Sequence, residues 1–335
     1  MLVSFAIVAY NEEKALPKLL NDLSFQDYPK EKIEVLLINS MSTDATREIM
    51  ETFKVQHTEF YSVSVFDNPK KNIPSGHNVA LENATGDAII RIDAHASMPS
   101  SFISKNVEVL KSGEFASGGR RPNIIDGATS WKETLLCAEQ SMFGSSIAPY
   151  RNSEKKRYTS SLFCGMYRKE VYDTVGEYNE LLPRSEDNDM SYRMRKAGYK
   201  LCYSPDIVFY QQTRSTLPKM LKQKFLNGYW IGKTLGISPK CFSLFHFVPF
   251  AFIIGIILTS VLSILNLPFL ANLMWSAYLL LVFVMSVIET VKKPKLTNIF
   301  LPLIFFLLHL SYGVGTLIGI IELPFWLIKI KKHID

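Results

Sequence analysis

The sequence predicts an α/β fold with a mostly parallel sheet, followed by a helical membrane segment. Short apolar runs, typical of buried strands, alternate with helical patterns through the N-terminal part of the chain. This alternation is typical of parallel strands joined by right-handed crossovers. Residues 244–288 and 296–321 contain no Lys, Arg, Asp or Glu. Uncharged apolar runs of about 18 residues or more are candidates for membrane spans.

The expected strands and helices alternate through the N-terminal region. Apolar runs predict the strands, and residues 12–24 carry leucines at helical spacing. The next helix is expected to begin at Ser42, Thr43 or Asp44, which are favourable N-cap residues. A further helix is expected to end at Gly86. In chain order, the prediction is a strand at 3–9, a helix at 12–24, a strand at 33–38, a helix ending near 53, a strand at 61–66, a helix at 74–84 and a strand at 88–92.

The pattern is more mixed over residues 115–213. A short strand is expected to break at Gly118 and Gly119, and residues 160–166 are predicted to form another strand. Residues 187–197 are predicted to form a helix. Their acidic residues lie in the first turn and their basic residues in the last, and both ends suit the helix dipole.

Polar side chains fall at the ends of several predicted strands. Asn11, Asn39 and Asp93 lie at such ends. Because ligands bind at the carboxyl ends of parallel strands, we expect these three residues to share one pocket. In the stretch IIRIDAHASMP at 89–99, side chains two residues apart on a strand leave the same face, so Asp93 and His95 are expected to point together. Such a pair could hold a metal ion or simply lie in water at a strand end.

Charge divides the chain into three expected parts. These are a catalytic domain at 1–213, a basic interfacial segment at 214–243 and a membrane segment at 244–335. The basic segment contains six Lys or Arg residues, no acidic residue and several aromatic residues. A basic helix with interleaved aromatic residues is typical of a helix that lies on an anionic bilayer. Because a candidate membrane span follows directly, we favour this use over nucleic-acid binding.

The C-terminal part predicts two to three membrane helices. Residues 245–265 and 268–288 form two candidate spans, and the lysines that follow the second predict a hairpin with both ends in the cytoplasm. Residues 298–328 are long for one span and short for two. A single crossing would leave Lys329, Lys331 and Lys332 outside, against the same rule. Gly313 and Gly315 could allow a bend that forms a re-entrant or partly interfacial hairpin, and we prefer a cytoplasmic C-terminus.

The N-terminus and the cysteines indicate a cytoplasmic catalytic domain. The opening stretch MLVSFAIVAYNEE lacks the basic region of a signal peptide. The four cysteines are scattered, without a CxxC pair, so neither a zinc site nor a disulfide framework is indicated. We therefore expect a multi-pass protein of the cell membrane with its catalytic domain in the cytoplasm.

Four stretches occur in an order that is typical of one enzyme family. They are IVAYNEE at 7–13, NSMSTDAT at 39–46, NIPSGHNVALENATGDAIIRIDAHA at 72–96 and GMYRKEVYDTVGEYNELLPRSEDNDMSYRMRKAGY at 165–199. Together they resemble glycosyltransferase family 2, the inverting enzymes of GT-A fold. The resemblance is to the membrane-anchored exopolysaccharide type, similar to succinoglycan glucosyltransferases, in which the metal motif reads DAH. It implies a GT-A type, Rossmann-like sheet.

The resemblance implies a metal ion and a general base. Asp93 and His95 would bind Mn²⁺ or Mg²⁺, and the imidazole favours manganese. The ion would stabilise the departing diphosphate as a Lewis acid. Asp187 would be the base that takes a proton from the acceptor hydroxyl, with Glu186 orienting the acceptor or the base. The alternative is that both carboxylates merely cap a helix. Asp189 is expected to be only structural.

The resemblance also implies contacts with the nucleotide. Asn11, Glu13 and Asp44 are candidates, although Glu13 and Asp44 could instead stabilise helix N-termini. Asn39 replaces an aspartate that usually meets the base, and its amide can still bond a uracil edge. Arg214 lies in a stretch similar to the QxxRW motif of processive synthases and could clamp the diphosphate or merely begin the basic segment. The Trp of that motif is absent, which favours transfer of a single sugar.

These expectations lead to one functional hypothesis and two alternatives. The leading hypothesis is transfer of a single sugar from a nucleotide-sugar donor, UDP-linked, to a lipid-linked oligosaccharide acceptor in surface or exopolysaccharide synthesis. The first alternative is a processive polysaccharide synthase, which product length would distinguish. The second is a catalytically silent membrane scaffold that binds a nucleotide, which turnover by the wild type and by Asp187→Asn would distinguish.

Overall fold

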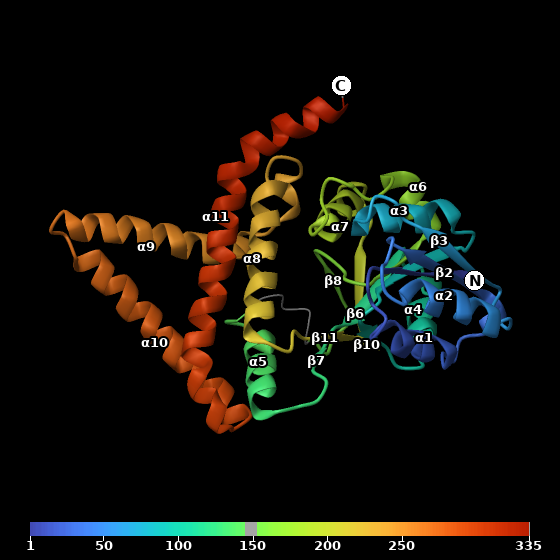
Figure 1. Cartoon of the computed structure of the whole chain (residues 1–335), viewed down its shortest axis with the longest axis horizontal. Coiled ribbons are helices and arrows are strands. Elements are labelled where there is room, and N and C mark those ends of the chain that lie inside the picture. The colour runs from blue at the N-terminus through green and yellow to red at the C-terminus, as the bar shows by residue number, and fades with distance from the viewer. Residues whose placement is uncertain (145–152, 335) are drawn as a thin grey trace. The chain divides into compact units, whose positions relative to one another are not determined.

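The computed structural model describes residues 1–144 and 153–334. The chain divides into two compact units. The first comprises Met1–Pro122 and Pro149–Gln212, and the second comprises Asn123–Ala148 and Thr213–Asp335. The first unit is an α/β domain, whereas the second consists mainly of helices (Figure 1).

Within the residues that the structure describes, a mostly parallel sheet forms the centre of the first unit, as predicted. Its strands are β1 (Val3–Ala9), β2 (Ile33–Asn39), β3 (Ser62–Asp67), β4 (Ala88–Asp93), β6 (Ala116–Arg120), β8 (Arg157–Thr159), β9 (Met166–Arg168) and β10 (Leu201–Val208). Their spatial order is β3-β2-β1-β4-β9-β6-β10-β8. Neighbours among β1 to β4 pair in parallel, as do β6 and β10, whereas β8 and β9 run antiparallel to their neighbours. A short antiparallel pair joins β5 (Ala96–Ser97) to β11 (Tyr210–Gln212).

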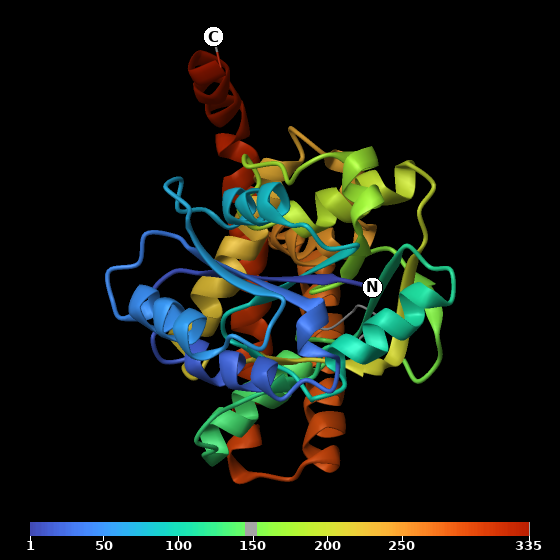
Figure 2. The same cartoon turned by 90° about the vertical axis from the view of Figure 1, so that its right-hand side faces the viewer.

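Helices cover both faces of this sheet. They are α1 (Leu16–Ser24), α2 (Thr46–Gln56), α3 (Ile73–Asn83), α4 (Phe102–Lys111), α6 (Lys169–Val175) and α7 (Glu186–Lys196), with a 3₁₀ turn at Lys30–Lys32. One face packs against α1, α2 and α4, and the other packs against α3, α6 and α7 (Figure 2). Strands buried on both faces need apolar side chains on both, which explains the continuous apolar runs in the sequence.

Local sequence explains the helix boundaries that matter for the site. The side chain of Asn72 caps α3 by accepting a hydrogen bond from the Ser75 amide at 2.8 Å. In α7, three acidic residues lie in the first turn and three basic residues lie in the last. The helix predicted at 187–197 is therefore confirmed, and its first turn presents carboxylates where the helix dipole favours them.

Two predictions for residues 115–213 are wrong. Residues 160–165 do not form a strand, because Cys164 adopts a left-handed conformation with φ of 49° and turns the chain before β9 begins at Met166. In addition, β6 continues through Gly118 and Gly119 instead of breaking there. A Cβ atom on Gly119 would lie 1.9 Å from the carbonyl oxygen of Ile207, so the glycine is needed for the close approach of β10.

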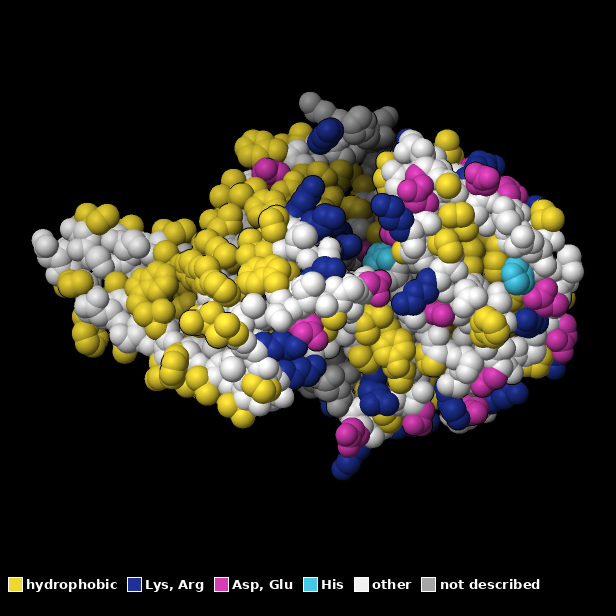
Figure 3. All heavy atoms as spheres, turned by 60° about the horizontal axis from the view of Figure 1, so that its bottom comes forward, with side chains coloured by type: hydrophobic (Ala, Val, Ile, Leu, Met, Phe, Trp, Pro, Cys, Tyr) yellow, Lys and Arg dark blue, Asp and Glu magenta, His cyan; other side chains and the backbone are white. Residues whose placement is uncertain are grey.

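The second unit contains the apolar helices expected from the sequence. Three stretches, Leu244–Ile264, Phe269–Lys292 and Leu296–Lys331, are long and apolar enough to cross a membrane. Hydrophobic side chains cover much of their surface (Figure 3). The elements of this unit are β7 (Asn123–Ile124), α5 (Ser130–Gln140), α8 (Leu217–Thr234), α9 (Val248–Ile264), α10 (Phe269–Lys292), α11 (Leu301–Ile334) and 3₁₀ turns at Pro239–Cys241, Leu244–Phe247 and Leu296–Phe300.

The expected bend at Gly313 and Gly315 is wrong, because α11 is one continuous helix through both positions. The two glycines permit close packing instead. A Cβ atom on Gly313 would lie 2.2 Å from the carbonyl oxygen of Pro249, and one on Gly315 would lie 2.2 Å from that of Phe225. The missing side chains therefore let α11 approach the backbones of α9 and α8.

Glycines from both partners form the contact between α8 and α11. Gly228 and Gly232 lie on α8, and Gly315 and Gly319 lie on α11. A Cβ atom on Gly319 would lie 2.2 Å from the carbonyl oxygen of Tyr229. On each helix the two glycines are four residues apart and therefore lie on the same face, which allows this close backbone approach. Helices in a membrane often associate through such small residues, because the apolar surroundings remove the hydrophobic driving force.

Two basic residues of the 214–243 segment are buried inside the second unit. Lys224 pairs with Glu139 of α5 at 2.9 Å, and Lys233 pairs with Glu322 of α11 at 3.2 Å. These two lysines therefore stabilise the packing of α8 within its own unit. Contact of the segment with a bilayer surface stays a prediction, and it would rely on its exposed lysines, Lys219, Lys222 and Lys240.

The contact between α8 and α11 predicts that a glycine substitution within it lowers stability more than a glycine substitution outside it. Gly319→Ala should lower the melting temperature of the detergent-purified protein by several degrees, because overpacking a tight contact costs about 1–3 kcal/mol. Gly255→Ala in α9 is the matched control, since its Cβ would meet only the side-chain sulfur of Met274 at 3.1 Å. Equal melting temperatures for the two variants would contradict the packing described for α8 and α11.

Candidate active site

Three neighbouring parallel strands end at the same edge of the sheet. In the register of the sheet, Val8 of β1 pairs with Asp93 of β4, and Ala9 of β1 pairs with Asn39 of β2. Asn39 and Asp93 are therefore the last residues of two strands that flank β1, and Asn11 follows the end of β1. The structure brings these three sequence-predicted residues to one sheet edge.

Left-handed backbone conformations, which residues other than glycine rarely adopt, cluster at this edge. Asn11, Met41 and Lys71 have φ values of 55°, 59° and 59°, and they follow the ends of β1, β2 and β3 respectively. Non-glycine residues in the left-handed region cost free energy and persist where surrounding contacts impose them, often at functional sites. The loops at this edge are therefore held in specific shapes.

Hydrogen bonds join the loops that follow β1 and β2. The Asn11 side-chain oxygen accepts from the Thr43 amide at 2.8 Å, and the Asp44 carboxylate accepts from the Glu13 amide at 3.2 Å. Partial desolvation of Asp44 is outweighed by hydrogen bonds from Thr46 and Glu13, which lower its pKa. Asn11, Glu13 and Asp44 thus meet in one loop cluster, and their contact with a nucleotide stays a prediction.

Asn39 is buried, and both ends of its amide are bonded within the protein. Its oxygen accepts from the Ser42 amide at 3.0 Å, and its nitrogen donates to Asp67 at 2.9 Å. Arg47 also holds Asp67, at 2.7 Å. The hydrogen bond from Asn39 and the Arg47 guanidinium together lower the pKa of Asp67. Sequence reasoning missed Asp67, although it is the last residue of β3 and the rule applied to the other strand ends would have found it.

Asp93 and His95 lie at the end of β4. The strand ends at Asp93 and residues 94–95 form a turn, so the strand geometry expected to align the two side chains does not continue to His95. Ala94 is buried, and Asp93 and His95 are partly exposed. The His95 Nδ1 atom lies 3.2 Å from Oε1 of Glu12. Sequence reasoning missed Glu12 and chose its neighbour Glu13. In the described part of the chain, no group of three or more His, Cys, Asp or Glu side chains gathers as a metal site.

The first turn of α7 brings Asp187 to the same face of β4 as Asp93. Asp187 forms an ion pair with Arg91, whose side chain leaves β4 on the face that Asp93 shares. Glu186 is only 7% exposed, and burial raises its pKa; the charge of Arg91 opposes this increase and the charge of Asp93 adds to it. Glu186, Asp187 and Asp93 therefore belong to one cluster of carboxylates around a buried cation.

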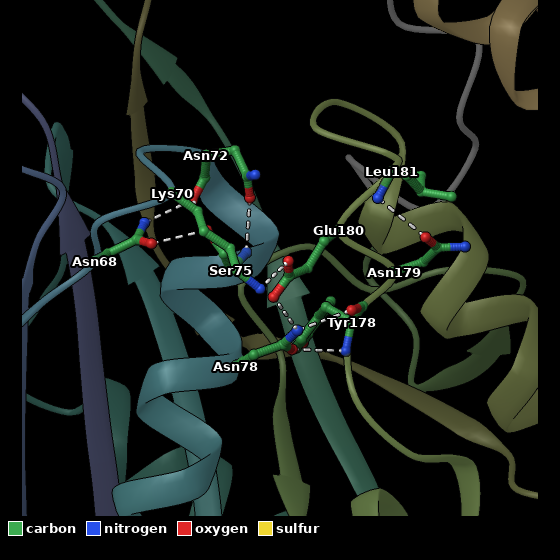
Figure 4. A network of polar contacts seen from close by, with 9 residues as sticks. All are labelled: Asn68, Lys70, Asn72, Ser75, Asn78, Tyr178, Asn179, Glu180 and Leu181. Carbon is green, nitrogen blue, oxygen red and sulfur yellow. Dashed lines mark hydrogen bonds and ion pairs between the residues drawn. The ribbon is translucent and has the colours of Figure 1, made fainter. Parts of the chain in front are cut away.

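A hydrogen-bond network fixes the loop that leads into α7 (Figure 4). Asn78 of α3 donates to the carbonyl of Tyr178 at 2.9 Å and accepts from the Tyr178 amide at 2.8 Å. Lys70, in the loop after β3, pairs with Glu180 at 2.7 Å. The loop before the candidate base is thus attached to α3 and to the loop after β3. Arg214 belongs to the second unit, and its contact with a diphosphate stays a prediction.

The raised pKa of Glu186 gives a prediction for stability against pH. Because the folded state holds this proton more tightly than the unfolded chain, wild-type stability should fall as pH rises above about 4.3, where the unfolded side chain ionises. Glu186→Gln removes that loss, so its melting temperature should rise relative to wild type between pH 4 and pH 7. Glu177→Gln, at an exposed carboxyl of the same loop region, is the reference. A difference between Glu186→Gln and wild type that stays constant with pH would contradict the burial of an ionisable Glu186.

Comparisons with known proteins identify the family of the chain. Residues 4–176 match the profile of glycosyl transferase family 2. The dolichyl N-acetyl-alpha-D-glucosaminyl phosphate 3-beta-D-2,3-diacetamido-2,3-dideoxy-beta-D-glucuronosyltransferase of Methanococcus voltae is 27% identical over 326 residues, which cover 96% of this chain and 97% of that protein. The succinoglycan biosynthesis protein ExoA of Rhizobium meliloti is 28% identical over 202 residues, which cover 59% of this chain and 59% of that protein.

A solved structure shares the fold. The mannosyltransferase PcManGT from Pyrobaculum calidifontis, in complex with GDP-Man and Mn²⁺, matches with a TM-score of 0.64 and 16% identity, covering 94% of this chain and 86% of its own. This likeness confirms the predicted GT-A type fold. The family profile spans slightly more than half of the 335 residues. The chain therefore belongs to glycosyl transferase family 2, and it is a glycosyltransferase.

Proposed function

We propose that this glycosyltransferase transfers one sugar, with inversion, from a UDP-linked donor to a lipid-linked oligosaccharide in surface or exopolysaccharide synthesis. The observation that carries the proposal is the pairing of Asp187 with Arg91, on the strand face that also ends in Asp93. The relative from Methanococcus voltae, aligned along nearly the whole chain, is named for a dolichyl-phosphate-linked sugar, which supports a lipid-linked acceptor.

The side chains at the end of β4 suit a divalent cation. A carboxylate and an imidazole, Asp93 and His95, would hold Mn²⁺ or Mg²⁺ and leave positions for diphosphate oxygens. Glu12 lies at Nδ1 of His95, and a carboxylate on one ring nitrogen commonly orients a metal-binding imidazole. When bound, the cation supplies Lewis acidity that stabilises the departing diphosphate. Asp93 and His95 orient the donor, and the loops carrying Asn11, Glu13, Asn39 and Asp44 bind its nucleoside part.

Asp187 acts as the general base in this proposal. Inversion requires the acceptor hydroxyl to attack the anomeric carbon on the side opposite to the diphosphate, so the base and the metal ligands must face each other across the sugar. The Asp187 carboxylate accepts the hydroxyl proton as the new glycosidic bond forms. Glu186, buried beside Asp187 in the first turn of α7, orients the acceptor or the base.

The apolar helices hold the enzyme at a membrane in this proposal, with the catalytic unit in the cytoplasm. An acceptor with a lipid tail is confined to a membrane, so an enzyme with membrane helices meets it there. Helix α11 has 34 residues, about 51 Å at the usual rise. It exceeds the hydrocarbon core of roughly 30 Å, so it is long enough to cross once with turns left at its ends.

Transfer assays test the proposed reaction. Detergent-purified protein incubated with a panel of radiolabelled nucleotide sugars and a lipid-linked acceptor should give one product that is a single sugar longer. Asp187→Asn should lower the rate by about 10²–10⁴-fold, the usual contribution of a general base, while nucleotide binding by calorimetry stays unchanged. A ladder of products would indicate a processive synthase, and full activity of Asp187→Asn would exclude this residue as the base.

The metal role gives a separate prediction. Asp93→Asn and His95→Ala should each weaken Mn²⁺-dependent binding of UDP by at least about 10-fold, since even residues behind metal ligands contribute factors of 10–100. Calorimetry with and without a chelator measures this without relying on turnover. Asp173→Asn, at an exposed carboxylate of α6, is the control. Equal UDP affinity in the presence of Mn²⁺ and of chelator would overturn the metal role.

A further inference from the structure

Arg91 is a buried cation that the proposed reaction does not use. Its side chain is 5% exposed although it lies within strand β4, among apolar residues. A buried charge is costly unless it is paired and hydrogen-bonded. Arg91 is therefore held in place by specific partners, and those partners indicate what it does.

Three side chains from three different segments contact the guanidinium. Asp187 of α7 forms an ion pair with Nη2, the hydroxyl of Tyr178 accepts from Nε at 3.0 Å, and Nε2 of His77 on α3 lies 3.0 Å from Nη1. A guanidinium can only donate hydrogen bonds. His77 must therefore accept at Nε2, which requires its neutral form. Burial, followed by the charge of Arg91, lowers the pKa of His77 well below its usual value, in agreement with this assignment.

The two neutral partners are themselves fixed by the fold. His77 and Asn78 are adjacent on α3, and Asn78 binds both the amide and the carbonyl of Tyr178. The Tyr178 hydroxyl also lies 3.3 Å from that of Tyr172. Figure 4 shows how Asn78 and the neighbouring polar residues attach the Tyr178 loop to α3. Arg91 thus sits in a rigid frame, and Asp187 is its one partner with a proposed part in the reaction.

Strand geometry sets where this frame holds Asp187. Arg91 and Asp93 are two residues apart and leave the same face of β4, which separates their positions along the strand by about 7 Å. A carboxylate paired with Arg91 therefore lies on the strand face that ends in Asp93. The guanidinium is permanently charged and offers donors in a fixed planar arrangement, so it orients a carboxylate partner.

We propose that Arg91 is a positioning residue for the candidate base: it orients the Asp187 carboxylate on the strand face that ends in Asp93. This inference rests on the proposed function. In the transfer step the acceptor hydroxyl proton passes to Asp187, the glycosidic bond forms and the bond to the diphosphate breaks. Arg91 keeps all its protons and touches neither substrate.

The test separates charge from packing with two substitutions of similar size. Arg91→Lys keeps a cation near Asp187, whereas Arg91→Met keeps only the apolar stem. For Arg91→Met, kcat should fall by about 10–100-fold, part of the contribution of a general base. Arg91→Lys should retain several-fold more activity than Arg91→Met. The dissociation constant and KM for the donor should stay within about 2-fold of wild type for both variants.

Arg193→Met is the matched control. Arg193 also pairs with an aspartate of α7, Asp189, at 2.9 Å. In addition, Arg193 donates hydrogen bonds to the carbonyls of Val175 and Glu177. Arg193→Met should lower the melting temperature while leaving kcat within about 2-fold of wild type at a temperature where it is folded. If Arg91→Lys and Arg91→Met lower kcat equally, or if Arg193→Met lowers it as much as Arg91→Met, Arg91 has only a packing role and the inference is wrong.

A double-mutant cycle distinguishes failure of this inference from failure of the proposed function. In the Asp187→Asn background, Arg91→Met should change the residual rate by less than about 2-fold, because residues that act as one unit are not additive. The same cycle on unfolding free energy should show coupling between the two residues. Full activity of Asp187→Asn would overturn the proposed base. If Asp187→Asn is slow and Arg91→Met lowers its rate by the same factor as in the wild type, only the role of Arg91 is overturned. The same holds if the unfolding free energies show no coupling between the two residues.

Discussion

The ion pair between Arg91 and Asp187 joins the central sheet to the helix that carries the candidate base. A buried guanidinium requires a carboxylate partner, and the packing of α3 and of the Tyr178 loop leaves the first turn of α7 to supply it. The helix dipole favours acidic residues at that same turn. The stability of this part of the domain and the position of the base therefore depend on one contact.

The second unit is organised by a different constraint. Three of its described stretches, Leu244–Ile264, Phe269–Lys292 and Leu296–Lys331, are strongly apolar, so apolar burial in a membrane would give them little preference for one neighbour over another. Glycines on α8 and α11 provide such a preference for this helix pair, because a side chain at these positions would collide with the backbone of the neighbouring helix. Buried pairs such as Lys224 with Glu139 add specific polar contacts to the same unit. A family 2 glycosyltransferase domain and membrane-type helices are thus combined in one chain, which suits an acceptor with a lipid tail.

The parts of the site that depend on strand ends were predictable from the sequence, whereas the parts that depend on distant packing were not. Asp93 follows a buried strand, and parallel topology alone brings it to the edge of the sheet. Arg91 gives no such signal, because its partners come from three separate segments. The apolar run around Cys164 predicts a strand, because nothing in the local sequence reveals the left-handed conformation of Cys164. The role of Gly315 was missed because it depends on the neighbouring helix and not on flexibility.

The central claim is that the metal ligands and the base face one gap. A crystal grown with UDP and Mn²⁺, measured at a wavelength where manganese scatters anomalously, tests this most directly. The account predicts an anomalous peak in contact with Asp93 and His95, with Asp187 still paired to Arg91 and facing the ion across a space that a sugar fills. A manganese ion held by other residues, or an Asp187 carboxylate turned away from that space, would contradict it.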